Sequence, residues 1–183
     1  NLSQWRKAMA SYRDFQIAYP KDSRTKEATR RIGVLKDLAR YQALVDEKGQ
    51  RKAFDAQYQI ATIVAAQLAN PVKAIIEYRK VQVTWPQSHL ADDALFKVGV
   101  TYLSMNQTAQ ARAALLEVGA NYPNSPLADD ALFMVGQSYE TEAIALAGVT
   151  RASSIAKQKK MAQKIAYKNF SDDNLRQKES NKL

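Results

Sequence analysis

Apolar side chains recur along most of this chain at steps of three and four residues, which place them on one face of an α-helix. In three segments an alanine is followed at the same spacing by two larger apolar residues and a proline. The three sets are Ala8, Tyr12, Phe15 and Pro20; Ala74, Tyr78, Val81 and Pro86; and Ala111, Leu115, Val118 and Pro123. Because proline cannot continue a helix, each set predicts an amphipathic helix that ends before its proline.

A second pattern is a near-repetition, because residues 122–139 match residues 85–102 at 12 of 18 positions. The two copies share the stripe Leu95, Val98, Gly99 and Tyr102, which recurs as Leu132, Val135, Gly136 and Tyr139. We expect both copies to form first helices in equivalent environments. The recurring small residue, which is also found as Gly33 and Ala61, would let a neighbouring helix approach closely. Ser23, Ser88 and Ser125 are predicted N-caps.

The repeated segments contain two pairs of adjacent acids, Asp92–Asp93 and Asp129–Asp130. Adjacent helical residues point about 100° apart, so neither pair forms a facing catalytic dyad. Each pair is predicted in the first turn of a helix, where negative charge stabilises the N-terminus. The second interpretation is that these acids contact a partner protein.

A helix pair that repeats every 37 residues or so cannot bury its apolar stripe alone, and stacking of copies solves this. We therefore predict an all-α fold, an α-solenoid of antiparallel helix pairs with about seven to eight helices. The array is expected over residues 1–149, with an irregularity at 24–50 that leaves one helix unpaired. Helices are predicted near 24–47, 51–69 and 71–84. Gly148 is expected to end a helix, so that 150–183 form a basic capping helix with a polar tail.

Over residues 4–20 and 51–139 these two helix patterns resemble tetratricopeptide repeats. The segment YPNSPLADDAL between units resembles the corresponding segments of bacterial envelope members of that family. They include the periplasmic tetratricopeptide protein that accompanies the Tol–Pal system and the lipoprotein of the outer-membrane β-barrel assembly machine. The resemblance implies tetratricopeptide-like helix pairs and a non-enzymatic scaffold that binds envelope proteins or components of a larger assembly. It also implies a periplasmic or outer-membrane-associated location.

In tetratricopeptide arrays the first helix of each unit lines the concave groove. By that resemblance the partner-binding groove comprises Tyr58, Gln59, Thr62, Asp93, Phe96, Lys97, Val100, Asp130, Phe133, Gln137 and Glu140. The basic and Asn residues with which some cytosolic relatives clamp a C-terminal carboxylate are missing from these places. A chaperone-tail receptor is therefore disfavoured. The aromatic residues are expected in the core more than on a ligand platform: Tyr58, Tyr78, Phe96, Tyr102, Phe133 and Tyr139.

The amino-acid composition limits the kinds of catalytic or metal site that this chain can form. The chain has no cysteine and a single histidine, His89, which is expected in a solvated turn. A thiol nucleophile, a zinc site and a Ser–His mechanism therefore lack their components. The six glycines form no phosphate-binding loop. We expect no enzymatic activity, no cofactor and no metal.

The net charge of +9 lies at the two ends. Residues 1–50 hold 11 Lys and Arg against 6 Asp and Glu, residues 51–150 hold 7 against 9, and residues 151–183 hold 9 against 3. Nucleic acid is disfavoured as a partner, because no aromatic residues interleave with this charge in a stacking pattern. The C-terminal cluster comprises Lys157, Lys159, Lys160, Lys164 and Lys168. It is either the solvated face of a capping helix or a contact for an acidic partner, an anionic polymer or a membrane surface.

No stretch approaches the roughly 18–20 apolar residues that cross a bilayer, so only peripheral membrane contact is expected. The chain has no initiator Met and no signal-like start, and we expect a mature product or a piece of a longer protein. It opens on the second helix of a pair, which predicts an exposed end that could support self-association.

Overall fold

The computed structural model describes residues 2–47 and 53–180, and it describes side chains as far as residue 160, with the exception of Lys159. These residues form seven helices and no strand, which confirms the all-α prediction. The helices are α1 (Leu2–Ala18), α2 (Thr25–Asp46), α3 (Ala53–Ala66), α4 (Pro71–Thr84), α5 (Ala91–Ser104), α6 (Thr108–Asn121) and α7 (Ala128–Ser180). The turn predicted at residues 48–50 lies outside the described residues.

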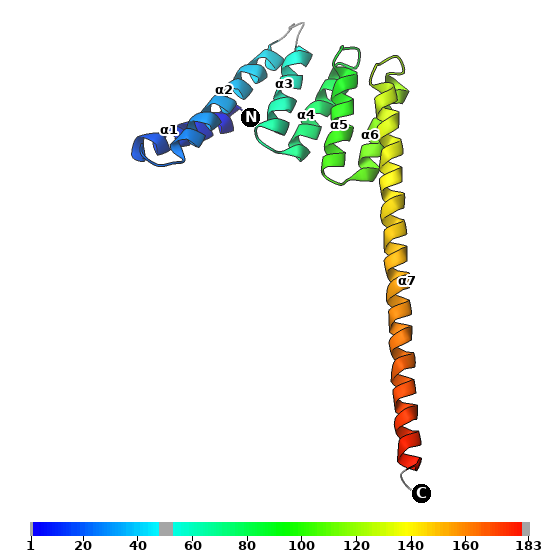
Figure 1. Cartoon of the computed structure of the whole chain (residues 1–183). Coiled ribbons are helices and arrows are strands. Elements are labelled where there is room, and N and C mark those ends of the chain that lie inside the picture. The colour runs from blue at the N-terminus through cyan, green and yellow to red at the C-terminus, as the bar shows by residue number, and fades with distance from the viewer. Residues whose placement is uncertain (1, 48–52, 181–183) are drawn as a thin grey trace. The chain divides into compact units, whose positions relative to one another are not determined.

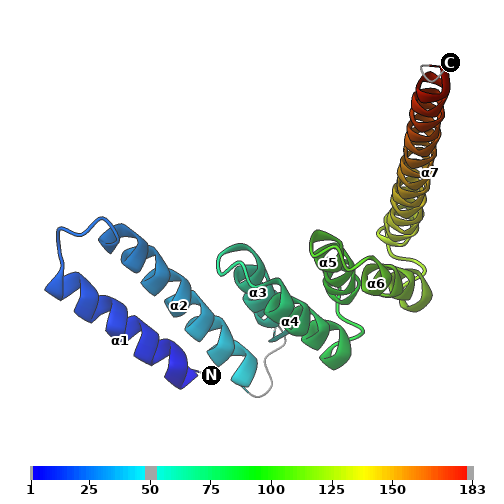
Figure 2. The same cartoon turned by 90° about the horizontal axis from the view of Figure 1, so that it is seen from below.

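The chain divides into two compact units, Asn1–Val135 and Gly136–Leu183. In the first unit each helix packs on the next one along the chain, from α1 to α6 (Figure 1). Figure 2 shows α1 and α2 lying antiparallel, side by side. The predicted solenoid of antiparallel helix pairs is therefore confirmed. Where one helix was predicted to be unpaired, α2 packs between α1 and α3.

The core of the first unit follows the predicted stripes. Leu38, Val64, Val81 and Val98 are completely or almost completely buried in one cluster that α1–α6 share. A second cluster contains Leu95, Leu115, Val118, Ala131 and Val135. Burial of these apolar side chains on both sides of each inner helix supplies the main stabilising free energy of the array.

Gly99 lies at a close approach between α5 and α6. A Cβ built at Gly99 of α5 would lie 2.6 Å from Cγ of Leu115 of α6, so only glycine fits there. The prediction of a close approach is therefore confirmed at Gly99. It is wrong at Gly33 and Gly136, where a Cβ would meet no atom within 4 Å.

Three interhelical turns share one backbone design. The N–H of Asp22 donates to the carbonyl of Tyr19 at 3.1 Å, as Ser88 donates to Trp85 and Ser125 to Tyr122, both at 2.9 Å. The N-cap prediction for Ser23, Ser88 and Ser125 is wrong, because the next helices begin only at Thr25, Ala91 and Ala128. Asp22, and not Ser23, occupies the place of the other two serines.

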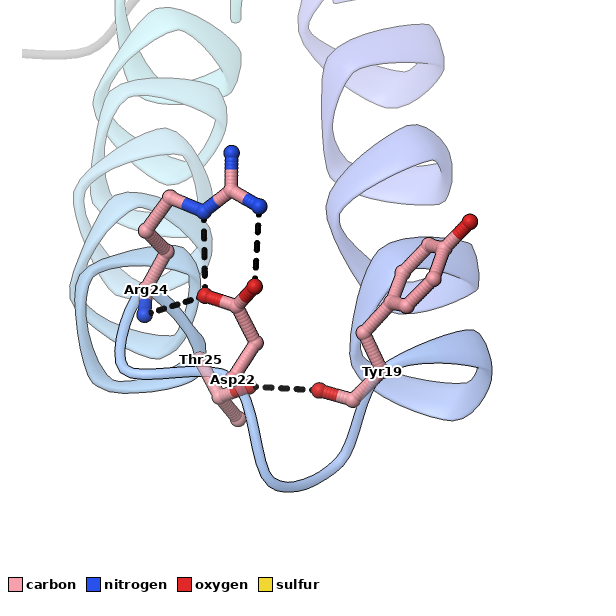
Figure 3. Close-up of polar contacts among 4 residues, drawn as sticks. All are labelled: Tyr19, Asp22, Arg24 and Thr25. Atoms are coloured by element: carbon pink, nitrogen blue, oxygen red, sulfur yellow. Dashed lines mark hydrogen bonds and ion pairs between the residues drawn. The ribbon is translucent and has the colours of Figure 1, made fainter.

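Figure 3 shows the first of these turns. The Asp22 carboxylate accepts hydrogen bonds from the Arg24 backbone N–H at 2.8 Å and from its guanidinium at 2.9 and 2.8 Å. These bonds lower the pKa of Asp22 to about 2. The Thr25 hydroxyl donates to the Tyr19 carbonyl at 3.1 Å, which ties the start of α2 to the end of α1.

The repeated segments 85–102 and 122–139 are helical at the same positions, but their environments differ. Leu95 is completely buried, whereas its counterpart Leu132 is 54% exposed. Phe133 is 67% exposed and Tyr139 is 55% exposed. The expectation of equivalent environments is therefore wrong at these positions. The physical reason is that α6 packs on α5, whereas no described helix follows α7 in the array.

The second unit consists of the continuation of α7. The predicted helix end at Gly148 is wrong, because α7 runs without a break from Ala128 to Ser180. One glycine costs a helix only about 1 kcal/mol, and the flanking segment AIALA is made of strong helix formers. The proposed division at residue 149 stays a prediction. All described side chains from Tyr139 to Gln158 are exposed.

Across the described part of the chain, no helix combines the length and the apolar character needed to span a membrane.

Candidate protein-interaction surface

Helices α3 and α5, each of which is the first helix of its pair, are joined by a polar contact. The Tyr58 hydroxyl of α3 donates a hydrogen bond to the Asp93 carboxylate of α5. Burial and this bond raise the pKa of Tyr58 well above its usual value. The Tyr58 ring meets the ring of Tyr78 of α4 edge-on at 5.4 Å, and the Tyr78 hydroxyl lies 3.3 Å from Oγ1 of Thr62. The Tyr58 side chain is thus held by two contacts, one with Asp93 of α5 and one with Tyr78 of α4.

The predicted groove residues of α3 and α5 fall at helical spacing, and the Tyr58–Asp93 bond brings their two faces together. We call this surface the inner row: Tyr58, Gln59, Thr62, Asp93, Phe96, Lys97 and Val100. Gln59 and Lys97 are exposed, and the other five side chains are half-buried. The inner row therefore combines aromatic and apolar area with an exposed amine.

The groove residues predicted on α7 are divided between the two units. Asp130 and Phe133 lie in the first unit and are exposed. Gln137 and Glu140 belong to the second unit and are also exposed. Among the aromatics predicted in the core, Tyr78 is buried, and Tyr58, Phe96 and Tyr102 are half-buried. The core prediction is wrong for Phe133 and Tyr139.

The basic C-terminal cluster is only partly described. Lys157 and Lys160 are exposed on α7. Lys159, Lys164 and Lys168 lie outside the described side chains.

A cleft between the α4–α5 and α6–α7 turns was missed by sequence reasoning. It encloses about 460 Å³ and is lined by Pro86, Gln87, Ser88, His89, Asp92, Asn121, Tyr122, Pro123, Asn124, Ser125 and Pro126. The Ser125 hydroxyl donates to the Asp92 carboxylate at 2.5 Å and accepts from the Leu127 N–H at 3.1 Å. The repeated sequence motif aromatic–Pro–x–Ser/Asp is the signal that could have located these turns.

The other half of this cleft is built differently. The Ser88 hydroxyl oxygen is buried and has no hydrogen-bond partner among the described residues. The position of Asp92 is taken one unit earlier by Phe54, which meets the His89 ring edge-on at 5.2 Å. His89 is exposed, and its Nε2 lies 3.8 Å from Oδ1 of Asp55. The predicted solvated turn position of His89 is therefore confirmed.

Within the residues whose side chains are described, no group of three His, Asp or Glu side chains is placed to hold a metal ion. The Asp92 carboxylate accepts a hydrogen bond from the Ser125 hydroxyl, and the Asp93 carboxylate accepts one from the Tyr58 hydroxyl. Asp92 and Asp93 lie in the first turn of α5, and Asp129 and Asp130 lie in the first turn of α7, as predicted.

Comparison with known families matches residues 93–125 to the model described as tetratricopeptide repeat. No curated protein and no solved structure matches the chain. The matched residues cover most of α5, all of α6 and the beginning of the next turn, which is one helix pair with its closing proline. The helix pair α5–α6 is therefore similar to a tetratricopeptide repeat.

Proposed function

We propose that this chain is a non-enzymatic scaffold that binds other proteins through the inner row. Tetratricopeptide repeats are typically non-catalytic interaction modules, and the matched pair contributes Asp93, Phe96, Lys97 and Val100 to the inner row. The single observation that carries the proposal is the Tyr58–Asp93 bond. It joins the first helices of two neighbouring pairs into one continuous, prearranged surface.

The chemistry of the inner row favours a protein segment with apolar and acidic groups. Phe96 and Val100 offer half-buried apolar area, and the exposed Lys97 amine can pair with a carboxylate. Because Tyr58 and Asp93 already bind each other, little side-chain entropy is lost when a partner docks.

Site-specific photo-crosslinking in the native source would test this proposal. A photoreactive residue at Gln59 or Lys97 should form adducts with a defined protein, whereas the same residue at Ile76 should not. Ile76 is the matched control because it is 53% exposed but lies on α4. In binding assays with the identified protein, Lys97→Glu should weaken binding by about tenfold. Equal adducts at Ile76 and Lys97 would contradict the proposal.

Binding of an anionic polymer or a membrane surface through the two basic termini, residues 1–50 and the C-terminal cluster, is the alternative. The exposure of Lys157 and Lys160 favours it. Such binding should collapse between low and moderate salt, because it depends on screened charge. Binding through the inner row should mostly survive the same change. A salt titration of the captured complex therefore separates the two candidates.

We further propose that the protein works in a bacterial envelope, in the periplasm or at the outer membrane. The resemblance of the YPNSPLADDAL wording to envelope tetratricopeptide proteins supports this location. Cell fractionation followed by immunodetection of the chain tests it, and recovery of the chain only with cytosolic markers would contradict it.

A further inference from the structure

Helix α4 carries a row of exposed apolar side chains along one of its faces. Val72, Ile76 and Val83 are 58, 53 and 70% exposed, whereas Ala74 and Val81 of the same helix are completely buried. Steps of four and seven residues place the three exposed side chains on one helical face. A shallow hollow of about 330 Å³ lies along this face and is lined by Ile75, Ile76, Arg79, Lys80, Val83 and Thr84. A contiguous exposed apolar surface of this kind marks a contact site.

Two lysines flank this apolar row. Lys73 lies three residues before Ile76 and Lys80 lies four residues after it, so both lysines share its helical face. Both lysines are exposed. The Lys80 ammonium pairs with the Glu77 carboxylate at 2.7 Å, but an ammonium has three donors and can bind a second anion at the same time. We call the following residues the α4 face: Val72, Lys73, Ile76, Lys80 and Val83.

Neither α4 nor α6 presents an exposed acid. The single acid of α4, Glu77, is buried and accepts a hydrogen bond from Lys80. The single acid of α6, Glu117, is half-buried and pairs with Arg79 of α4 at 2.7 Å. This ion pair joins the two helices, and Leu116 of α6, at the position equivalent to Arg79, is 46% exposed. The joined surface is therefore apolar and cationic, and no exposed carboxylate on it opposes an anionic partner.

An anionic membrane surface matches both properties of the α4 face. Lipid phosphates lie directly above the acyl chains, so a lysine can hold its ammonium group at a phosphate while its stem lies along apolar neighbours. A soluble polyanion would pair with the lysines but would leave Val72, Ile76 and Val83 in water. The apolar positions are spread over α4 and α6, which favours an extended surface over a single acidic helix of a partner protein.

We propose that the α4 face binds the surface of a membrane that contains anionic lipid. The side chains of Val72, Ile76 and Val83 enter the boundary between head groups and acyl chains, and Lys73 and Lys80 contact the lipid phosphates. Three partly exposed apolar side chains bury little area, so the binding is reversible and requires the apolar and the electrostatic contribution together.

Co-sedimentation of the purified full-length chain with lipid vesicles tests this contact without any other partner. Vesicles of equal parts phosphatidylglycerol and phosphatidylcholine should bind the chain, and vesicles of phosphatidylcholine alone should bind it at least about tenfold more weakly. The double variant Lys73→Gln, Lys80→Gln should weaken binding to the anionic vesicles by about tenfold or more, because it removes two cations near the charged surface. The double variant Ile76→Ser, Val83→Ser should weaken it by about tenfold, because two apolar side chains no longer leave water.

Two variants on α7 are the matched controls. The double variant Lys157→Gln, Lys160→Gln removes the same charge from exposed positions, and Ile144→Ser replaces an apolar side chain that is 66% exposed. Both controls should bind the anionic vesicles as the unchanged chain does. Circular dichroism should show the same helix content in all variants, so that a change in binding reports on the surface and not on folding.

A fluorescent label then tests which face meets the lipid. The chain has no cysteine, so a thiol-reactive, polarity-sensitive dye reacts only with an introduced cysteine. The dye on Val83→Cys should shift its emission to the blue on addition of anionic vesicles and should be quenched by spin-labelled lipid. The dye on Gln59→Cys, an exposed position of the inner row on α3, should show neither effect.

Three results would overturn the proposal. They are a chain that does not bind the anionic vesicles, binding that only the lysine variants weaken, as for a purely ionic contact, and equal emission shifts at Val83 and Gln59. A loss of binding in the Lys157→Gln, Lys160→Gln control alone would assign the contact to the basic C-terminal cluster instead. The α4 face shares no residue with the inner row, so its failure would leave the proposed role of the inner row unaffected.

Discussion

Single residues at equivalent places of the repeat have different contacts, because their neighbours differ from one unit to the next. Ser125 binds the Asp92 carboxylate, whereas Ser88 occupies the same turn position and has no such acid, because Phe54 stands in its place. Gly99 is packed against Leu115, whereas Gly119 on the partner helix has no atom within 4 Å of its Cβ position. Two predictions follow from these contrasts.

Replacement of the two turn serines should have opposite effects on stability. Ser125→Ala removes a hydrogen bond to a carboxylate and should lower the free energy of unfolding by about 1–2 kcal/mol. Ser88→Ala removes a buried hydroxyl without a described partner and should raise it by about 0.5–1 kcal/mol. Urea unfolding of both variants measures these changes. A loss of stability in Ser88→Ala would show that its hydroxyl is bonded.

Replacement of glycine by alanine should lower the stability of the folded protein at Gly99 and raise it at Gly119. The Cβ that Gly99→Ala introduces would overlap Leu115, which is completely buried, so overpacking of about 1–3 kcal/mol should exceed the helical gain of about 1 kcal/mol. Gly119→Ala should keep that gain, because its Cβ meets nothing. Thermal unfolding monitored by circular dichroism compares the two. Equal shifts in midpoint would contradict the close packing at Gly99.

At the scale of elements, the turns within helix pairs determine where the second helices begin. Asn70 caps α4, because its side chain accepts a hydrogen bond from the Lys73 N–H at 3.0 Å, and Pro71 follows at the first helical position. The residue before this cap, Ala69, has a φ of +49°, and Asn106 before α6 has a φ of +58°. Asparagine tolerates this left-handed conformation, whereas alanine is strained in it.

Replacement of Ala69 should therefore stabilise the α3–α4 turn. Ala69→Gly should raise the free energy of unfolding by about 1 kcal/mol, because glycine adopts positive φ without a Cβ clash. Asn106→Ala at the equivalent turn should lower it by a similar amount. Chemical unfolding of the two variants gives both values, and a destabilised Ala69→Gly would contradict the strained geometry.

At the scale of the whole molecule, the two units should differ in resistance to opening. The first unit has buried clusters along α1–α6, whereas the described side chains of α7 from Tyr139 to Gln158 are all exposed. A helix without tertiary packing is marginally stable in water. Trypsin should therefore cleave first at Arg151, Lys157 or Lys160, and the product should retain residues 1–135. Intact mass spectrometry of early time points tests this, and first cleavage at Arg79 or Lys97 would contradict it.

High pH should destabilise the first unit through its tyrosines. Burial raises the pKa of Tyr58, Tyr78 and Tyr122 in the folded chain. Above about pH 10 the unfolded chain loses these protons while the folded chain keeps them, so stability falls as pH rises. The loss should be less than about 1.4 kcal/mol per pH unit for each tyrosine. Tyr58→Phe should show a shallower decline between about pH 9 and about pH 11.5 in urea unfolding, and parallel curves would contradict this.

The sequence by itself determined the all-α class, the position of most helices and the place of the recurring acids, because these depend on local spacing: a step of three or four residues fixes a helical face, and proline ends it. It did not determine the extent of α7, which runs through Gly148, or the packing of α2 between α1 and α3. It also placed the members of the inner row on α3 and α5. Only the tertiary structure decided which equivalent positions are covered. The local sequence is nearly the same around Leu95 and Leu132, and around Gly99 and Gly136. Their burial differs because it depends on the helix that packs against them. For the same reason the Tyr58–Asp93 bond and the buried Ser88 hydroxyl, which has no partner among the described residues, could not be predicted. Each depends on residues far apart in the sequence that meet only when the helices stack.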